Sequence, residues 1–156
     1  MYKNCNIIMN QKDFYTEIFI NANPEIVWQT FLSKDGFFKS FFGTEIQTNF
    51  NIGDKIEFIS INGEERIVHI YGEILEYEKH KILAYIDHPG PIYYDNHAEL
   101  KSRVRITLEH IGQVTKLTLT NDQFSDNILR KEASQWWLIL SNFKTFLETG
   151  SLMKLK

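Results

Sequence analysis

The chain has 156 residues, 43% of them hydrophobic and 24% charged, so it can bury one core and has an ordinary globular composition. Its formal net charge is −3, and it shows no basic footprint of the kind that nucleic-acid binding or attraction to an anionic membrane requires. The one cysteine, Cys5, excludes a disulfide or a cysteine-based zinc site within a single chain and favours a reducing, cytoplasmic setting.

The start of the chain shows no targeting segment. The stretch "MYKNCNIIMNQKDF" lacks the apolar centre of a signal peptide, and no apolar run approaches the roughly 18 residues of a membrane helix. There is no internal repeat, low-complexity block or linker. We therefore expect a flexible N-terminal extension over residues 1–13 and a single domain over residues 14–156.

A strand and two short helices come first. Residues 15–21 alternate in polarity, with Ile18 and Ile20 on one face, which predicts a strand. Asn23 is a good N-cap and Pro24 suits the first helical position, so a helix is predicted to begin there. The following stretch "SKDGFFKSFFG" is short and aromatic, and it predicts a second short helix or a turn.

A run of strands fills the middle of the chain. Strands are predicted at about 41–48, 54–61 and 66–78, and in "KILAYID", "SRVRITLEH" and "VTKLTLTN". The connections have hairpin length, apart from a loop "HPGPIYYDNHAE". In the last two strands apolar and polar residues alternate, which is typical of an antiparallel sheet with one dry face.

The last predicted element is a long helix over about 128–149, ended by Gly150 as a C′ residue. Its apolar stripe follows helical spacing through Trp136, Leu140, Phe143 and Leu147. The order of elements predicts an α+β fold in which a curved antiparallel sheet wraps around this helix. A curled sheet cannot touch a straight helix along its whole length, so the enclosed space holds large side chains or a cavity.

Several short motifs occur in a fixed order along the chain. They read "IFINANPEIVWQTF", "GEILE", "VRITLEH" and "TKLTLTN", followed in the last helix by Trp136, Leu140, Phe143, Lys144, Leu147 and Glu148. In this order they resemble the AHSA family of the START-like (SRPBCC) superfamily, named for the activator of the heat-shock protein 90 ATPase. The resemblance runs from about Tyr15 to Thr149 and implies a helix-grip fold. Relatives usually have glycine just before the tryptophan; here Ser134 and Gln135 precede it, which bears on the shape of the pocket.

We predict non-catalytic binding of a small hydrophobic or aromatic molecule in the cavity between the sheet and the last helix, with no cofactor. Aromatic residues make up 14% of the chain, and they line pockets as well as cores. Polar groups such as those of Tyr85 or Tyr94 would orient the ligand. The residues predicted to line the cavity are Phe58, Tyr85, Tyr94, Val104, Ile106, Trp136, Leu140 and Phe143. Aromatic residues of the loop "HPGPIYYDNHAE" would either cover the pocket mouth or dock on the sheet edge.

Two groups of ionisable residues are interpreted as structural. Asp87, His88, Asp95 and His97 lack metal-ligand spacing, so we expect solvated loop residues and no metal site. His69, Tyr71 and Glu73 share one face of a strand, where they would be acid–base candidates only if that face lay inside. Because the other face carries Gly72 and Ile74, the trio is predicted to point outward.

Two further functions stay open. One is a cyclase, dehydratase or hydrolase acting on a polyketide-like or aromatic substrate, which would need an ionisable pair inside the cavity. The other, implied by the resemblance, is a co-chaperone role toward the heat-shock protein 90 ATPase. No nucleophile elbow, P-loop or dinucleotide fingerprint appears. Trp137 lies about 100° around the helix from Trp136 and is predicted to cover a sheet edge or to form a homodimer contact.

Overall fold

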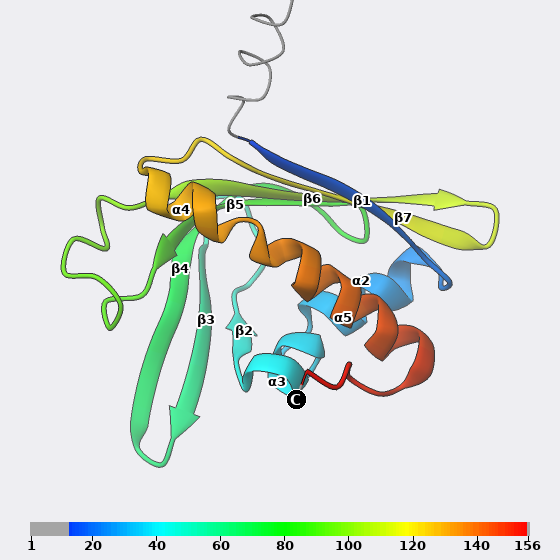
Figure 1. Cartoon of the computed structure of the whole chain (residues 1–156), viewed down its shortest axis with the longest axis horizontal. Helices are drawn as coiled ribbons and strands as arrows, with labels where there is room; N and C mark the ends of the chain where they lie inside the picture. The colour runs from blue at the N-terminus through cyan, green and yellow to red at the C-terminus, as the bar shows by residue number, and fades with distance from the viewer. Residues whose placement is uncertain (1–12, 156) are drawn as a thin grey trace, which may run out of the picture.

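The structure, a computed structural model, describes residues 13–155 (Figure 1). Its strands are β1 (Phe14–Ile20), β2 (Glu45–Gln47), β3 (Lys55–Asn62), β4 (Glu65–Glu78), β5 (Ile82–Pro89), β6 (Ser102–Ile111) and β7 (Val114–Asp122). Its helices are α2 (Pro24–Leu32), α3 (Phe37–Phe42), α4 (Asn127–Glu132) and α5 (Gln135–Thr149). Residues 1–12 of the predicted N-terminal extension lie outside the described residues, so the extension stays a prediction.

The strands form one seven-stranded antiparallel sheet in the order β1-β7-β6-β5-β4-β3-β2. Neighbours in the sheet from β2 to β7 are also neighbours in sequence, while β1 pairs with β7 at the far edge. Figure 1 shows β1, β7 and β6 above α5, and β3 and β4 turning down beside it. The sheet therefore curves around the C-terminal helix, which confirms the α+β helix-grip fold.

The concave face of the sheet is apolar along most of β6 and β7, as the alternating pattern predicts. On β6, Val104, Ile106 and Leu108 are buried, and the residues between them are more exposed. On β7, Leu117 and Leu119 are fully buried. These side chains form the floor on which the helices pack, and burying them supplies much of the hydrophobic stabilisation of the domain.

An aromatic cluster fills one end of the space between the sheet and α5. Helix α2 begins as predicted, because Ile26 N donates to Asn23 Oδ1 at 2.9 Å and Pro24 follows the cap. The helix then brings Phe31 to within 4.6 Å of the Phe143 ring, and Phe37 of α3 lies 5.4 Å from the same ring. Since Phe31 and Phe143 are at most 1% exposed, no open space remains at this end.

The predicted single helix over 128–149 is wrong, because the chain forms two helices with a break between them (Figure 1). At the junction Trp136 N donates to Ala133 O at 3.1 Å and Trp137 N to Ser134 O at 3.2 Å, so the turn is tighter than an α-helix. The Ser134 hydroxyl donates to Lys131 O at 3.1 Å. A serine that hydrogen-bonds back to the preceding turn competes with the regular helix ladder and bends it.

Strands β4 and β5 approach each other unusually closely at Gly72. A Cβ at this position would lie 1.5 Å from Ile86 O and 2.6 Å from Ile86 C, both of which are main-chain atoms. Gly72 lies between the register pairs Tyr71–His88 and Ile74–Tyr85, next to a register shift. Only glycine permits this spacing, which fixes where the inward side chains of β5 lie.

Trp137 contacts the edge strand of the sheet. Its ring packs edge-on against Phe14 of β1 at 5.1 Å, yet the side chain remains 59% exposed. This is the first of the two roles that the sequence suggests for Trp137. The homodimer contact stays a prediction.

Candidate ligand-binding cavity

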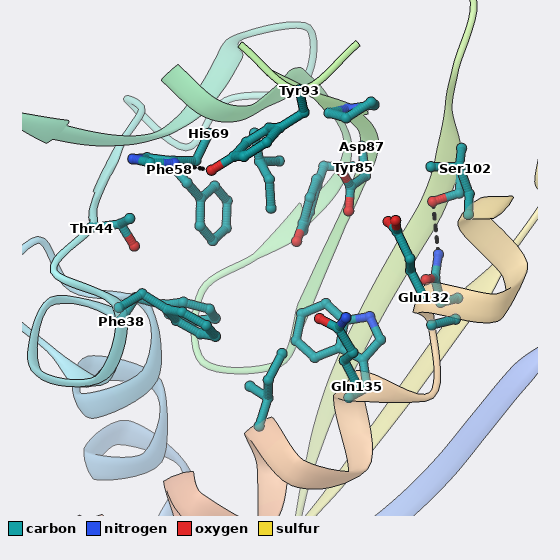
Figure 2. A pocket seen from close by; sticks show the side chains of 18 of the residues that line it. Phe38, Thr44, Phe58, His69, Tyr85, Asp87, Tyr93, Ser102, Glu132 and Gln135 are labelled. Carbon is teal, nitrogen blue, oxygen red and sulfur yellow. Dashed lines mark hydrogen bonds between the residues drawn. The ribbon is translucent and has the colours of Figure 1, made fainter. Parts of the chain in front are cut away.

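A cavity of about 640 Å³ occupies the other end of the space between the sheet and α5 (Figure 2). All strands from β3 to β7 contribute to its wall, together with α3, α4, the first half of α5 and the loop after β5. The lining residues used below are Phe38, Phe58, His69, Tyr85, Asp87, Tyr93, Tyr94, Ser102, Asn121, Glu132, Ala133, Gln135 and Trp136.

Aromatic rings form the apolar part of the wall. Phe58 of β3 lies between Phe38 of α3, in an edge-on contact at 5.2 Å, and Tyr85 of β5 at 6.0 Å. Trp136, at the start of α5, is 9% exposed and also lines the cavity. Phe38, Phe58 and Tyr85 thus pack against one another along one side of the cavity, and Trp136 adds a further ring to the wall.

A pair of carboxyl groups and a hydroxyl lie in one part of the cavity. Figure 2 shows Asp87 and Tyr85 of β5 and Glu132 of α4 directed into the same space. Tyr94, in the loop after β5, donates its hydroxyl to Glu132 Oε1 at 3.1 Å. The chain thus brings two acidic residues from distant segments to one wall.

The pKa values of this group follow from its surroundings. Burial, with a smaller contribution from the negative charge of Glu132, raises the pKa of Asp87 from 3.8 to about 7. Burial and the neighbouring Asp87 raise the pKa of the Tyr85 hydroxyl well above 10, so it stays protonated and can donate a hydrogen bond. The charge of the Asp87 carboxyl group therefore changes near neutral pH.

His69 also lines the cavity, so the prediction that it points outward is wrong. The register of β3 with β4 pairs Phe58 with Ile70 and Ile59 with Val68, which leaves His69 as the extra residue of a bulge. Its ring is hydrogen-bonded through Nδ1 to the Tyr93 hydroxyl, and through Nε2 to Ser60 Oγ at 2.7 Å. The bulge redirects a side chain that strict alternation would place outside.

The rest of the trio does point away from the cavity. Tyr71 stacks on the His88 ring at 4.8 Å and is hydrogen-bonded to His97 Nδ1 at 2.6 Å. Glu73 is exposed on the same face of β4. The predicted loop position of Asp87 and His88 is wrong, because both belong to β5 and only Asp95 and His97 lie in the loop.

The end of the cavity beneath α4 is polar, and its side chains are hydrogen-bonded to each other. Asn121 Nδ2 donates to Ser102 Oγ at 2.9 Å and to Arg103 O at 2.9 Å. Ser102 and Asn121 are 5% and 4% exposed, respectively. Because these two side chains are neutral and one donates to the other, they shape the cavity without adding a charge to it.

The residues predicted to line the cavity divide into two sets. Phe58, Tyr85, Tyr94 and Trp136 lie on its wall. Val104, Ile106, Leu140 and Phe143 do not: they are buried in the filled part of the core, each at most 2% exposed. The difference follows from the aromatic cluster around Phe143, which closes that half of the enclosed space.

Sequence reasoning missed the acidic pair, although signals for it existed. Continuing the alternation of Leu83 and Tyr85 by two residues places Asp87 on the inner face. Glu132 precedes Trp136 by four residues, which is one helical turn. Among residues 13–155, no group of three His, Cys, Asp or Glu side chains is placed to hold a metal ion.

Comparison with solved structures supports the same architecture. A protein from Cytophaga hutchinsonii matches with a TM-score of 0.69 and 23% identity, over 88% of this chain and 94% of that chain. The Aha1 dimer from Colwellia psychrerythraea matches with a TM-score of 0.64 and 17% identity, over 89% and 98%. A protein from Mesorhizobium loti matches at 0.68 and 18%, over 90% and 99%. At these identities the likeness is one of fold.

Sequence comparisons assign the chain to a family, and its helices were also assessed for the ability to span a membrane. No curated protein matches the chain at the sequence level. None of the helices in residues 13–155 combines the length and apolar character that a membrane-spanning helix requires. The model of one family, by contrast, matches residues 21–148, which is most of the chain and includes every element from α2 to nearly the end of α5. The protein therefore belongs to the family described as Activator of Hsp90 ATPase homolog 1-like protein.

Proposed function

We propose that the protein binds a small molecule with a large apolar or aromatic part in the cavity, and that it does not transform this molecule. The family fold is compatible with ligand binding. The observation that carries the proposal is that Phe58, Tyr85 and Trp136 surround an open space of about 640 Å³. Ligand pockets commonly measure about 300–1,000 Å³ and owe their affinity to such apolar walls.

Native mass spectrometry of freshly purified protein tests this proposal directly. The expected result is an added mass that is lost under denaturing conditions, because a small molecule held by burial alone leaves when the fold opens. Repeated spectra of the empty chain from several expression hosts would count against a physiological ligand.

A cavity-filling variant gives a quantitative prediction. Ala133→Phe adds an aromatic ring at a buried lining position, so we expect it to weaken binding of the neutral fluorescent probe 2-naphthalenemethanol by at least about tenfold. Leu138→Phe is the matched control, since it places an aromatic ring at an exposed position of α5 outside the lining. Fluorescence titration measures both variants; equal weakening in the two would place the probe elsewhere on the molecule.

An acid–base enzyme is the second candidate, favoured by the position of Asp87. A carboxyl group whose pKa is raised to about 7 inside a cavity can give and take a proton at neutral pH. The tyrosine hydroxyl of Tyr85 beside it supplies a hydrogen-bond donor. Conversion of the co-purified compound by the wild-type protein, and its loss in Asp87→Asn, would favour this candidate over simple binding.

We also propose a cytoplasmic location and a homodimer as the assembly to test first. The Colwellia relative is described as a dimer. Light scattering on the purified protein measures the oligomeric state, and Trp137→Ser tests whether the exposed indole takes part. A monomer at all concentrations would count against the dimer.

A further inference from the structure

We infer that the ligand of the cavity carries a protonated amine, which binds between the carboxyl groups of Asp87 and Glu132 while its apolar part contacts the aromatic wall. The inference deepens the proposed function and rests on it, since it specifies the chemical class of the molecule bound. It follows from the charge of the lining, from two unpaired polar groups inside the cavity and from the aromatic rings beside them.

The charge of the lining has one sign. Asp87 and Glu132 are its carboxylic acids, and none of the described residues that line the cavity is a lysine or an arginine. A ligand with a carboxylate or a phosphate would therefore meet the like charges of half-buried Asp87 and exposed Glu132, and this repulsion would weaken its binding. A cation meets attraction from both carboxyl groups.

The carboxyl group of Asp87 differs from buried carboxylates on the other face of the sheet. Glu57 pairs with Arg66 at 3.0 Å, and Asp122 accepts from Arg103 Nε at 2.8 Å. By contrast, the Asp87 side chain makes no hydrogen bond and no ion pair with any residue between 13 and 155. Asp87 is half-buried on the cavity wall, and a carboxylate drawn partly out of water is stabilised by a nearby cation, so a ligand can supply the partner that Asp87 lacks.

Tyr85 gives a second, independent indication. The residue is 1% exposed, and Figure 2 shows its hydroxyl directed into the cavity. The hydroxyl has no hydrogen-bond partner among the described residues. It is not fully enclosed by protein atoms either, so it is accessible from the cavity. A buried hydroxyl facing an open space is placed to accept an N–H from an ammonium group or to donate to a polar atom of the ligand.

The aromatic wall suits a cation as well as an apolar body. Phe58, Tyr85 and Trp136 all line the same cavity as the carboxyl groups. The faces of such rings attract ammonium groups, most strongly where water is excluded. An aromatic or branched aliphatic amine thus satisfies the whole lining, whereas a neutral hydrocarbon would leave Asp87 without a partner.

Three probes with one apolar body test the inference. They are 2-naphthylmethylamine, the neutral 2-naphthalenemethanol and the anionic 2-naphthoic acid, each titrated against the full chain at pH 8 by calorimetry. We expect the amine to bind at least about tenfold more tightly than the alcohol, and the acid to bind more weakly than both. Equal binding of amine and alcohol, or tighter binding of the acid, overturns the inference while leaving the proposed function intact. Absence of binding by all three contradicts the proposed function and the inference together.

Variants locate the cation. In Asp87→Asn and in Glu132→Gln, we expect the ratio of amine affinity to alcohol affinity to fall at least about fivefold. Glu73→Gln removes an exposed carboxylate of β4 outside the cavity and is expected to leave this ratio unchanged. A ratio that persists in both cavity variants overturns the assignment of the amine to these carboxyl groups.

The preference for the amine is also expected to depend on pH. Asp87 faces Glu132 of α4, Tyr85 of its own strand, and His69 and Tyr94 across the cavity. As the pH rises from 6 to 8 the Asp87 carboxyl loses its proton, so amine affinity should increase while alcohol affinity stays nearly constant. The same titration in Asp87→Asn should remove most of this increase; an unchanged pH dependence there assigns it to another group.

Discussion

Asp87→Asn is expected to raise the free energy of unfolding by about 3–4 kcal/mol at pH 8 and to change it little at pH 4. Burial raises the pKa of Asp87 from 3.8 to about 7, so between these values the folded chain keeps a proton that the unfolded chain has lost. The stability of the wild-type protein therefore falls as the pH rises through this window, and the full loss is present above pH 7. Asparagine has no ionisable proton, so the stability of the variant does not fall as the pH rises through this window. Urea denaturation of both proteins at the two pH values measures the difference.

Glu73→Gln is the control for this experiment, because Glu73 is exposed on β4. Surface substitutions of this kind usually change stability by less than about 0.5 kcal/mol, and we expect that at both pH values. A gain from Asp87→Asn that is the same at pH 4 and pH 8 would contradict a carboxyl group held in apolar surroundings. The expected gain also implies that this carboxyl lowers the stability of the domain, which is common for groups retained at binding sites.

Gly72→Ala is expected to lower the free energy of unfolding by more than about 4 kcal/mol, which is exceptional for one methyl group. The new Cβ would lie 1.5 Å from Ile86 O, and a main-chain carbonyl cannot turn aside as a flexible side chain can. Strands β4 and β5 must separate there. Since Tyr85 and Asp87 flank Ile86, we also expect loss of probe binding in whatever fraction still folds. Thermal and urea unfolding measure the first effect, and fluorescence titration measures the second.

Gly112→Ala separates steric overlap from backbone strain. Gly112 has a φ of +61° in the turn between β6 and β7, and an added Cβ would meet nothing within 4 Å. Its substitution should lower the free energy of unfolding by only about 1–2 kcal/mol, from the left-handed conformation alone. Similar losses in the two variants would show that β4 and β5 can move apart at little cost.

Much of the fold could be predicted from local patterns. Alternation on β6 and β7 identified their dry faces, and Asn23 with Pro24 marked the start of α2. The errors arose where one residue interrupts a repeat. His69 is the extra residue of a bulge, and Ser134 tightens the turn between α4 and α5. Neither the bulge nor the tight turn alters the composition or the hydrophobic periodicity of its segment enough to be recognised in the sequence. Both become apparent only when the strand register and the helix hydrogen bonds are known.

The candidate site could be predicted only in part. The sequence indicates which side chains face inward, and Phe58, Tyr85 and Trp136 do so. It does not indicate which part of the enclosed space is filled, because that depends on where α2 and α3 place their phenylalanines relative to Phe143. The acidic pair was missed because Asp87 and Glu132 are 45 positions apart in sequence and meet only when α4 covers β5.

The junction at Ala133 and Ser134 also divides the wall of the cavity into parts that should open at different rates. Helix α4 has six residues and buries one of them, Leu129, whereas α5 buries Trp136, Leu140, Asn142 and Phe143. A short helix with one anchor unfolds locally at a much lower free energy than the sheet and α5 around it. Amide hydrogens of α4 should therefore exchange with solvent far faster than those of α5. Such local opening would give a ligand a route in and out of the cavity while the rest of the domain stays folded.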